Sequence, residues 1–308
     1  MQVPLYVDAC MKELLSVIKC GSTAYLMQQS MFLSPLKAVE FLNEHRVNTL
    51  CWVASALTII SGLGAFEDIK PEYMRTVCFG SEAFPVKQLQ LWQSACPGAR
   101  FVNLYGPTEA TGMSFYYVVD RDFSDGEPIP VGRPFDNTGF MLLREDDTEA
   151  APGETGEICI RGTALTHGYF DDPERTAAAF TQNPLNKHYP ELIYRTGDLG
   201  RINERGELVF VSRKDHQIKN MGHRVELGEI EACADGCEGV VRSCCMFDKQ
   251  KGKLLMFYMG AADEKTLGKY LRSMLPRYML PSKIKRLDAL PLLENGKIDR
   301  NSLKDMEI

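Results

Sequence analysis

From Ser34 to Leu104 the sequence alternates helix-like stretches with short apolar runs, and no other feature restricts the fold as strongly. The strand-like runs are residues 49–53, 75–79 and 100–104. Ser34 followed by Pro35 is typical of a helix N-cap and first turn, and predicts a helix to about Arg46. A second helix is expected at about 85–95. This alternation favours a mostly parallel sheet covered by helices.

Two of the predicted strands lead directly into polar loops that contain glycine. One strand is followed by Gly80-Ser81-Glu82, and the other by a loop that begins with Tyr105-Gly106. In sheets of this kind ligands bind at the carboxyl ends of the strands, so we expect a functional site at these loops. A glycine where a strand ends would also let the backbone approach a ligand closely.

The pattern changes after Asp120. Turn signals recur between short alternating runs such as 157–161, which is typical of antiparallel sheet and suggests a small β-barrel-like subdomain. From Asp215 the sequence predicts a small α+β domain with a strand near 216–219, a helix from about Leu227 to a glycine C-cap at Gly236, a hairpin over 249–253 and a helix from about Asp263. We therefore predict an α/β fold with domains 1–214 and 215–308, the first divided at about residue 120.

Composition excludes several classes of function. The chain has 308 residues and 44% are hydrophobic, enough for packed cores in about two domains. A net charge of -6 argues against non-specific binding of nucleic acid or anionic membranes. No apolar run reaches the roughly 18 residues needed to span a bilayer, and residues 1–4 lack signal-peptide character. The ten cysteines lie mainly in apolar stretches, so we expect reduced structural thiols in a cytoplasmic protein rather than disulfides or metal ligands.

Six motifs occur in order along the chain, although each alone is a weak signal. They are NLYGPTE at 103–109, GEICIRG at 156–162, YRTGDL at 194–199, SRKDHQIKNMGHRVELGEIE at 212–231, LPRYMLP at 275–281 and NGKIDR at 295–300. Lys297, for example, follows an Asn-Gly turn, where a lysine is normally a solvated charge. Together the six motifs resemble the core motifs of the adenylate-forming superfamily, which includes peptide-synthetase adenylation domains, D-alanine–carrier-protein ligases, acyl-CoA synthetases and luciferases.

The resemblance implies roles for residues around ATP. Lys297 would bridge the substrate carboxylate and the α-phosphate, which suits a compact charge on a long, mobile stem. Thr108 would bind the α-phosphate, and Glu109 would hold a phosphate-bridging Mg²⁺, a cation that prefers oxygen ligands. Tyr105 would stack on adenine. The other nucleotide-binding positions implied by the match are Gly80, Ser81, Glu82, Asn103, Gly106, Asp198 and Arg213.

The segment around Asp8 indicates the substrate class. Val7-Asp8-Ala9-Cys10 resembles the family segment in which an aspartate receives the α-ammonium group of an amino acid. Acyl-CoA synthetases, whose substrates lack that group, generally lack the aspartate. Transferred position by position, the rest of the pocket would be lined by Ala9, Lys12, Ser55, Val77, Phe79, Leu104, Gly112 and Met113. The apolar members suggest a small substrate such as alanine, to which Lys12 is a poor match.

A two-step cycle also follows from the resemblance. Asp198 would accept hydrogen bonds from both ribose hydroxyls, with Arg213 beside it. The carboxyl-terminal domain would swing about Asp215, first delivering Lys297 and then bringing the loop around Gly222 toward a pantetheine thiol. We see no carrier segment in the sequence, and we expect the acceptor to be a separate phosphopantetheinyl carrier protein.

One expected part of the family is not found in this sequence. The family places a Gly/Ser/Thr-rich phosphate loop ending in lysine, within a large amino-terminal subdomain, before the segment that contains Asp8. We therefore expect a fragment or one half of a split enzyme, with weak or no adenylation on its own. Two alternatives stay open: an acyl- or aryl-acid ligase in which Asp8 is incidental, and a catalytically silent remnant that binds nucleotide or a carrier protein.

Overall fold

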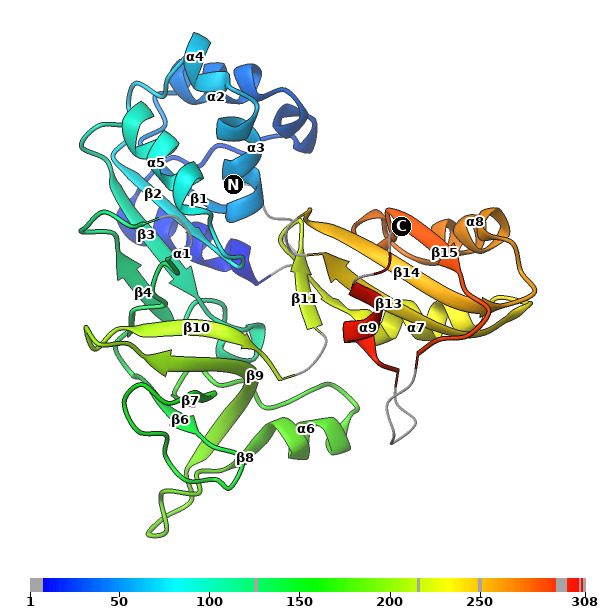
Figure 1. Cartoon of the computed structure of the whole chain (residues 1–308). Coiled ribbons are helices and arrows are strands. Elements are labelled where there is room, and N and C mark those ends of the chain that lie inside the picture. Colours follow the sequence, from blue (N-terminus) through cyan, green and yellow to red (C-terminus); the bar gives the residue numbers. More distant parts are fainter. Residues whose placement is uncertain are drawn as a thin grey trace. The chain divides into compact units, whose positions relative to one another are not determined.

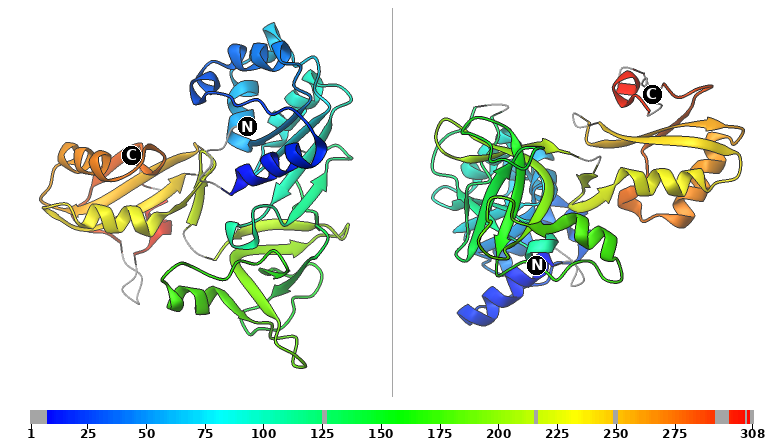
Figure 2. Two further views of the ribbon diagram at one scale, coloured as in Figure 1. Left: turned by 180° about the vertical axis from the view of Figure 1, so that it is seen from behind. Right: turned by 90° about the horizontal axis from the view of Figure 1, so that it is seen from below.

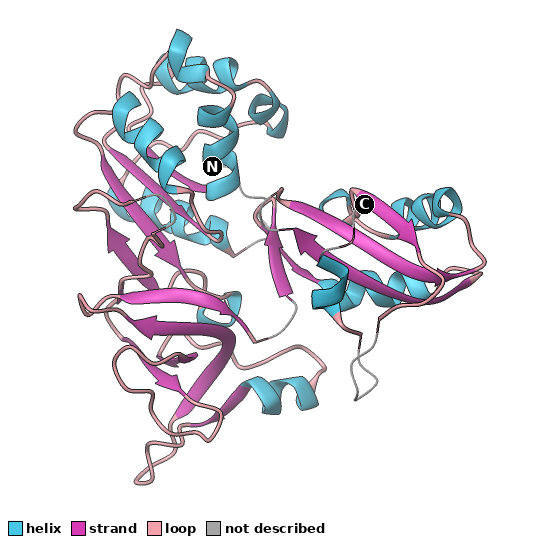
Figure 3. Cartoon of the chain, in the orientation of Figure 1, coloured by secondary structure: helices cyan, strands magenta, loops and turns pink. Residues whose placement is uncertain are grey.

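The computed structural model of the chain describes residues 8–124, 127–214, 217–248, 251–291, 298–304 and 306. They form two compact units, Met1–Lys214 and Asp215–Ile308, and each is described by itself. Figure 1 follows the chain through both units, and Figure 3 separates helices from strands.

A five-stranded sheet with the order β1-β2-β3-β4-β5 begins the first unit. Its strands are β1 (Thr49–Val53), β2 (Thr76–Gly80), β3 (Arg100–Tyr105), β4 (Phe115–Val118) and β5 (Arg133–Pro134). Strands β1, β2 and β3 are parallel, whereas β4 and β5 add antiparallel to the far edge. The predicted helix-covered, mostly parallel sheet is therefore confirmed for the three strands that the sequence indicates.

Helices cover both faces of this sheet. They are α1 (Ala9–Cys20), α2 (Pro35–Glu44), α3 (Ala54–Gly62), α4 (Ala65–Asp68) and α5 (Val86–Ala95), with short 3-10 turns η1 (Gln29–Leu33) and η2 (Thr108–Ala110). Trp92 of α5 is fully buried, and its indole N–H donates to the Leu57 carbonyl of α3 at 3.0 Å. Helix α1 lies behind the strands in Figure 1 and in front of them in the reverse view of Figure 2.

Two predicted helix caps occur at the expected residues, but neither makes the capping interaction that the sequence suggested. Pro35 is the first residue of α2, but the Ser34 side chain makes no capping hydrogen bond, and only its carbonyl accepts from the Ala38 N–H. Gly236 follows the last residue of α7 (Leu227–Asp235) with φ of -74°, a right-handed conformation. The left-handed glycine cap that the sequence suggested is therefore not used there.

A second, antiparallel sheet completes the first unit. Its order is β10-β9-β7-β6, with β8 also paired to β9. The strands are β6 (Thr138–Leu143), β7 (Gly156–Gly162), β8 (Phe180–Gln182), β9 (Leu192–Ile202) and β10 (Leu208–Arg213). The long strand β9 pairs with three others, and its register shifts against both β7 and β10. Helix α6 (Pro173–Ala179) is capped by the Asp172 side chain. This half-barrel agrees with the predicted antiparallel subdomain.

The second unit is a small α+β fold. A hairpin of β11 (Gln217–Asn220) and β12 (His223–Glu226) precedes α7, and a three-stranded sheet follows with β13 (Val240–Asp248), β14 (Lys253–Gly260) and β15 (Lys283–Arg286). Its remaining elements are α8 (Glu264–Met274), η3 (Arg277–Met279) and α9 (Arg300–Lys304). Cys245 and Tyr258 belong to the core formed with α7 and α8, whereas Cys244 and Phe257 belong to a separate core with Leu303 of α9. Side chains alternate between the two faces of this sheet along β13 and β14, and both faces are buried.

Among the described helices, none combines the length and the apolar character that a membrane-spanning segment requires.

Candidate functional site

Three residues that are far apart in the sequence meet in a buried cluster of the first unit. Tyr105 ends β3, Asp198 lies in β9 and Arg213 ends β10. The Tyr105 hydroxyl donates to Asp198 Oδ2 and the Arg213 Nη1 donates to Asp198 Oδ1, each at 2.5 Å. Burial, and then the Asp198 carboxylate, raises the pKa of Tyr105 well above its ordinary value, so its hydroxyl remains a proton donor.

The turn that carries Asp198 is held by Glu157 of β7. The Glu157 carboxylate is buried, accepts the Gly197 N–H at 3.0 Å and lies 3.2 Å from Lys214 Nζ. Thr196 accepts the Asp198 N–H at 3.0 Å and donates to the Ile158 carbonyl. Glu157 was not among the predicted site residues, and its only sequence signal is its place after glycine in the GEICIRG motif.

Glu109 is a third buried carboxylate, with 6% of its surface exposed. It lies in η2, directly after β3, and accepts a hydrogen bond from the Tyr169 hydroxyl at 2.6 Å. The Arg175 guanidinium stacks over the Tyr169 ring at 4.2 Å from its centroid. Sequence reasoning missed Tyr169, because the loop before α6 carries none of the six motifs. A carboxylate oxygen donor at this place suits a hard divalent cation such as Mg²⁺.

The two glycines at the strand ends are required by close backbone packing. A Cβ on Gly80 would lie 2.2 Å from the Leu104 carbonyl oxygen, and one on Gly106 would lie 2.1 Å from the Gly112 carbonyl oxygen. Ser81 next to Gly80 has φ of +66°, which is uncommon for a residue other than glycine. The predicted loops therefore lie close to neighbouring backbone where β2 and β3 end.

Replacing Gly106 with alanine should destabilise the first unit by about 1–3 kcal/mol or more, because the new Cβ overlaps backbone that cannot move freely. The matched control is Gly62→Ala in α3, where the added Cβ would meet nothing closer than 3.8 Å. That control should be neutral or stabilising by up to about 1 kcal/mol. Urea unfolding followed by circular dichroism measures both. Equal unfolding midpoints for the two variants would contradict the steric argument.

Two predicted nucleotide-binding residues make structural hydrogen bonds. The Glu82 carboxylate accepts the Ser55 N–H at 2.9 Å and so caps the first turn of α3. The Asn103 side-chain amide donates to the Pro130 carbonyl at 2.8 Å. Thr108 lies in the first turn of η2 and is exposed. The contacts of Glu82 and Asn103 hold neighbouring segments of the chain together. The nucleotide-binding roles of Glu82, Asn103 and Thr108 remain proposals.

Asp8 precedes α1 and lies beside the loop that follows β3. Its Oδ2 atom is buried and has no hydrogen-bond partner within the part of the chain that the structure describes. A Cβ on Gly112 would lie 3.6 Å from this atom, and the Gly112 carbonyl packs against Gly106. The carboxylate of Asp8 is thus adjacent to the loop that carries Glu109.

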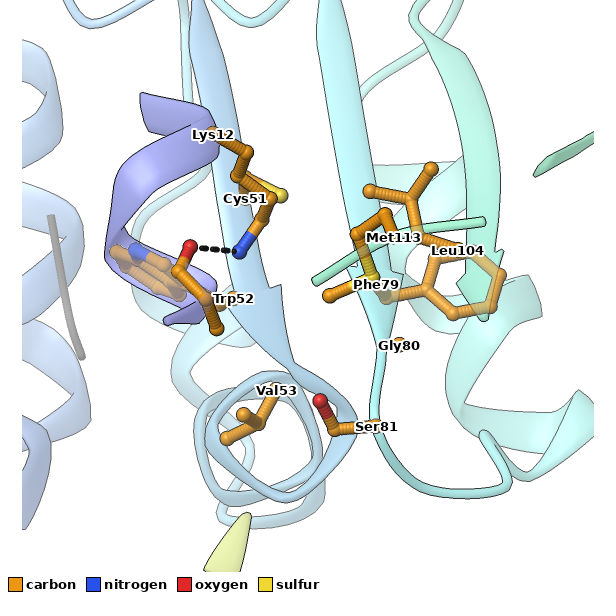
Figure 4. A pocket seen from close by; sticks show the side chains of 10 residues that line it. Lys12, Cys51, Trp52, Val53, Phe79, Gly80, Ser81, Leu104 and Met113 are labelled. Atoms are coloured by element: carbon orange, nitrogen blue, oxygen red, sulfur yellow. Dashed lines mark hydrogen bonds between the residues drawn. The ribbon is translucent and has the colours of Figure 1, made fainter. Parts of the chain in front are cut away.

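A small pocket lies between α1 and the carboxyl ends of the parallel strands (Figure 4). It is lined by Ala9, Lys12, Cys51, Trp52, Val53, Phe79, Gly80, Ser81, Leu104 and Met113. Lys12 is the only charged residue in this lining, and its ammonium donates to the Ala9 carbonyl at 2.7 Å (Figure 4). Val77, a predicted lining residue, is fully buried within the core that α3 and α5 form with the sheet.

The predicted catalytic lysine, Lys297, and the predicted hinge, Asp215, lie outside the described residues. The loop around Gly222 is described as the tight turn between β11 and β12, where Met221 and Gly222 both have positive φ.

Comparisons with known proteins agree on one family. A sequence model described as AMP-binding enzyme matches residues 1–170. Tyrocidine synthase 2 of Brevibacillus parabrevis is 34% identical over 305 residues, which is 97% of this chain. The solved structure of IdnL1 is 30% identical with a TM-score of 0.82 over 94% of the chain. PA1221, a nonribosomal peptide synthetase (NRPS) protein containing adenylation and peptidyl carrier (PCP) domains, is 28% identical with a TM-score of 0.81 over 98%.

The chain spans only part of each of these relatives. It covers 8% of tyrocidine synthase 2, 60% of the IdnL1 chain and 52% of the PA1221 chain. The activity, substrates and partners of those whole proteins are therefore not transferred to this chain without an argument from its own residues.

Proposed function

Because this chain belongs to the AMP-binding enzyme family of adenylate-forming ligases, we propose that it activates a small amino acid with ATP. A carboxylate oxygen of the amino acid would attack the α-phosphorus, pyrophosphate would leave, and an aminoacyl adenylate would form. The aminoacyl group would then pass to the pantetheine thiol of a separate carrier protein.

The observation that carries this proposal is the unpartnered oxygen of Asp8. A buried carboxylate oxygen without a hydrogen bond is costly, and native proteins contain few of them. An α-ammonium group would supply both the missing donor and the opposite charge. A hydrogen bond of this charge-assisted kind contributes about 1.5–3 kcal/mol. An acid without an ammonium group would leave Asp8 Oδ2 unsatisfied.

The cluster around Asp198 supports nucleotide binding. Each Asp198 oxygen already accepts one hydrogen bond, from Tyr105 or from Arg213. A carboxylate offers about four acceptor sites, so two ribose hydroxyls could still donate to it.

Charge stabilisation at the reacting phosphate is assigned to three residues. Glu109 would hold a Mg²⁺ ion that neutralises phosphate charge, with Tyr169 orienting its carboxylate. Thr108 would donate to the α-phosphate. Lys297 would bring a positive charge to the attacking carboxylate and the α-phosphate, and the six-motif resemblance is the support for this role.

The residues that line the pocket favour an amino-acid substrate with a small side chain. Phe79, Leu104 and Met113 bring bulky apolar groups to it, and Phe79 is 1% exposed. Transfer to a carrier protein is supported by the family and by the carrier domain of PA1221.

The test compares amino acids with their deaminated counterparts in ATP–pyrophosphate exchange and in hydroxylamine trapping. From this chain alone we expect at most weak exchange, supported by glycine, alanine or serine and not by the matching acids without the ammonium group. Faster exchange with the deaminated acids would favour an acyl- or aryl-acid ligase. Nucleotide binding without exchange for any acid would favour a silent remnant of the family.

A further inference from the structure

Two cysteines face each other on neighbouring strands of the first sheet. Cys51 of β1 is the register partner of Cys78 of β2, and the strands are parallel. Facing residues on adjacent strands are about 4.8 Å apart, and disulfides form across Cα separations of about 4.4–6.8 Å. Because paired residues on neighbouring parallel strands point to the same face of the sheet, the two thiols face each other.

The surroundings of this pair distinguish its two sulfurs. The hydrogen bond from Cys51 lowers the pKa of Cys78, and the positive charges of Lys12 and Arg100 act in the same direction. The same hydrogen bond, together with burial, raises the pKa of Cys51. Burial acts in the opposite direction and raises the pKa of Cys78, as does the nearby Glu13, whose effect is the smallest. Cys78 is therefore the sulfur that becomes a thiolate first.

Small solutes have a route to the pair. Both cysteines are half-buried rather than fully buried. Cys51 also lines the pocket beside Lys12 and Phe79, as Figure 4 shows. Two other thiols of this unit serve for comparison, because neither faces a second cysteine across the sheet. Cys96 is buried, and Cys20 is exposed at the end of α1.

We propose that Cys51 and Cys78 form a peroxide-reactive dithiol at the wall of this pocket, and that hydrogen peroxide converts the pair to a disulfide. The proposal stands on the facing positions of the two residues and on the place of Cys51 in the pocket lining. It does not require the proposed function, because disulfide formation needs no turnover of a substrate.

The reaction balances with peroxide as the only oxidant. The Cys78 thiolate attacks one peroxide oxygen, the O–O bond breaks and hydroxide leaves, which yields a sulfenic acid on Cys78. The Cys51 sulfur then attacks the Cys78 sulfur, so that an S–S bond forms and the S–O bond breaks. Water leaves with the Cys51 proton. Two thiols lose two electrons in total, and one peroxide becomes two waters.

Trypsin separates the relevant thiols into different peptides, which makes the disulfide measurable by mass spectrometry. Cleavage after Arg46, Arg75 and Lys87 places Cys51 in peptide 47–75 and Cys78 in peptide 76–87, since Lys70 precedes proline. Cys20 falls in peptide 20–37 and Cys96 in peptide 88–100. After peroxide treatment, alkylation and digestion, we expect a linked product of 47–75 and 76–87 that lacks two hydrogens and disappears on reduction.

Three controls decide the assignment. Cys78→Ser should abolish the linked product, whereas Cys20→Ser should leave it unchanged. In the unsubstituted protein, peptide 88–100 should remain alkylated, because burial raises the pKa of Cys96 to about 12. The proposal is overturned if Cys51 and Cys78 stay fully alkylated after peroxide, or if Cys78 stops at a sulfenic acid while Cys51 remains free. Preferential linkage of Cys20 would overturn it as well.

Discussion

Replacing Asp198 with alanine should lower the free energy of unfolding of the first unit by about 3–5 kcal/mol, the usual cost of removing one partner of a buried ion pair. Only 5% of the Asp198 surface is exposed, and its two oxygens accept from Arg213 and Tyr105. The substitution would remove the buried carboxylate to which the largely buried Arg213 guanidinium donates. Urea unfolding measures the loss.

A surface ion pair of the same unit provides the matched control. Arg144 and Glu154 also pair, but their side chains are 39% and 50% exposed. Removal of Glu154 should therefore hardly move the unfolding midpoint, because solvent screens an exposed pair. Similar losses for Asp198→Ala and Glu154→Ala would show that the buried cluster contributes no more than a surface contact. Asp198→Asn keeps the size of the side chain and one acceptor oxygen. Its loss in the free energy of unfolding should lie between those of Asp198→Ala and Glu154→Ala.

Replacing Asp8 with asparagine should weaken amino-acid binding by about 2–5 kcal/mol, the range for truncating one member of a buried charge pair. That corresponds to a loss of at least about 30-fold in affinity. Asparagine keeps the size of Asp8 and removes the negative charge, so the α-ammonium group would lose its counterion. The binding of propionate, which is alanine without the ammonium group, should change little.

Calorimetry with a non-reactive ATP analogue measures this effect without turnover. Asp136→Asn is the matched control, because it removes the same charge from an exposed position of the same unit. It should leave the affinity for alanine unchanged. If the Asp8→Asn protein binds alanine as tightly as the unsubstituted protein does, Asp8 does not receive the ammonium group.

The family and the order of the secondary structure were readable from the sequence because they depend on local information. Apolar runs at 49–53 and 100–104 specify strands by composition and length, and Pro35 places the start of α2 within one turn. The six motifs are also local, because a short run such as YRTGDL is identified by the types and the order of its residues. The AMP-binding family and the α/β fold class were therefore predicted correctly.

Contacts between residues that are far apart in the sequence could not be predicted from local patterns. Tyr169 meets Glu109 from 60 positions away, and Glu157 meets Gly197 from 40 positions away. No local pattern predicts either contact, because the first depends on how the loop before α6 packs beside η2 and the second on the pairing of β7 with β9. The same holds for Cys51 and Cys78, which become neighbours only through the register of β1 and β2.

The sequence alone was sufficient to determine the family and the fold class, since those follow from ordered local motifs and local periodicity. Only the tertiary structure decided that Asp8 Oδ2 is buried with no partner among the described residues, that both Asp198 oxygens are already engaged and that Gly106 has no space for a side chain. Burial and hydrogen-bond satisfaction are properties of the packed chain, because they depend on atoms contributed by segments that are remote in sequence.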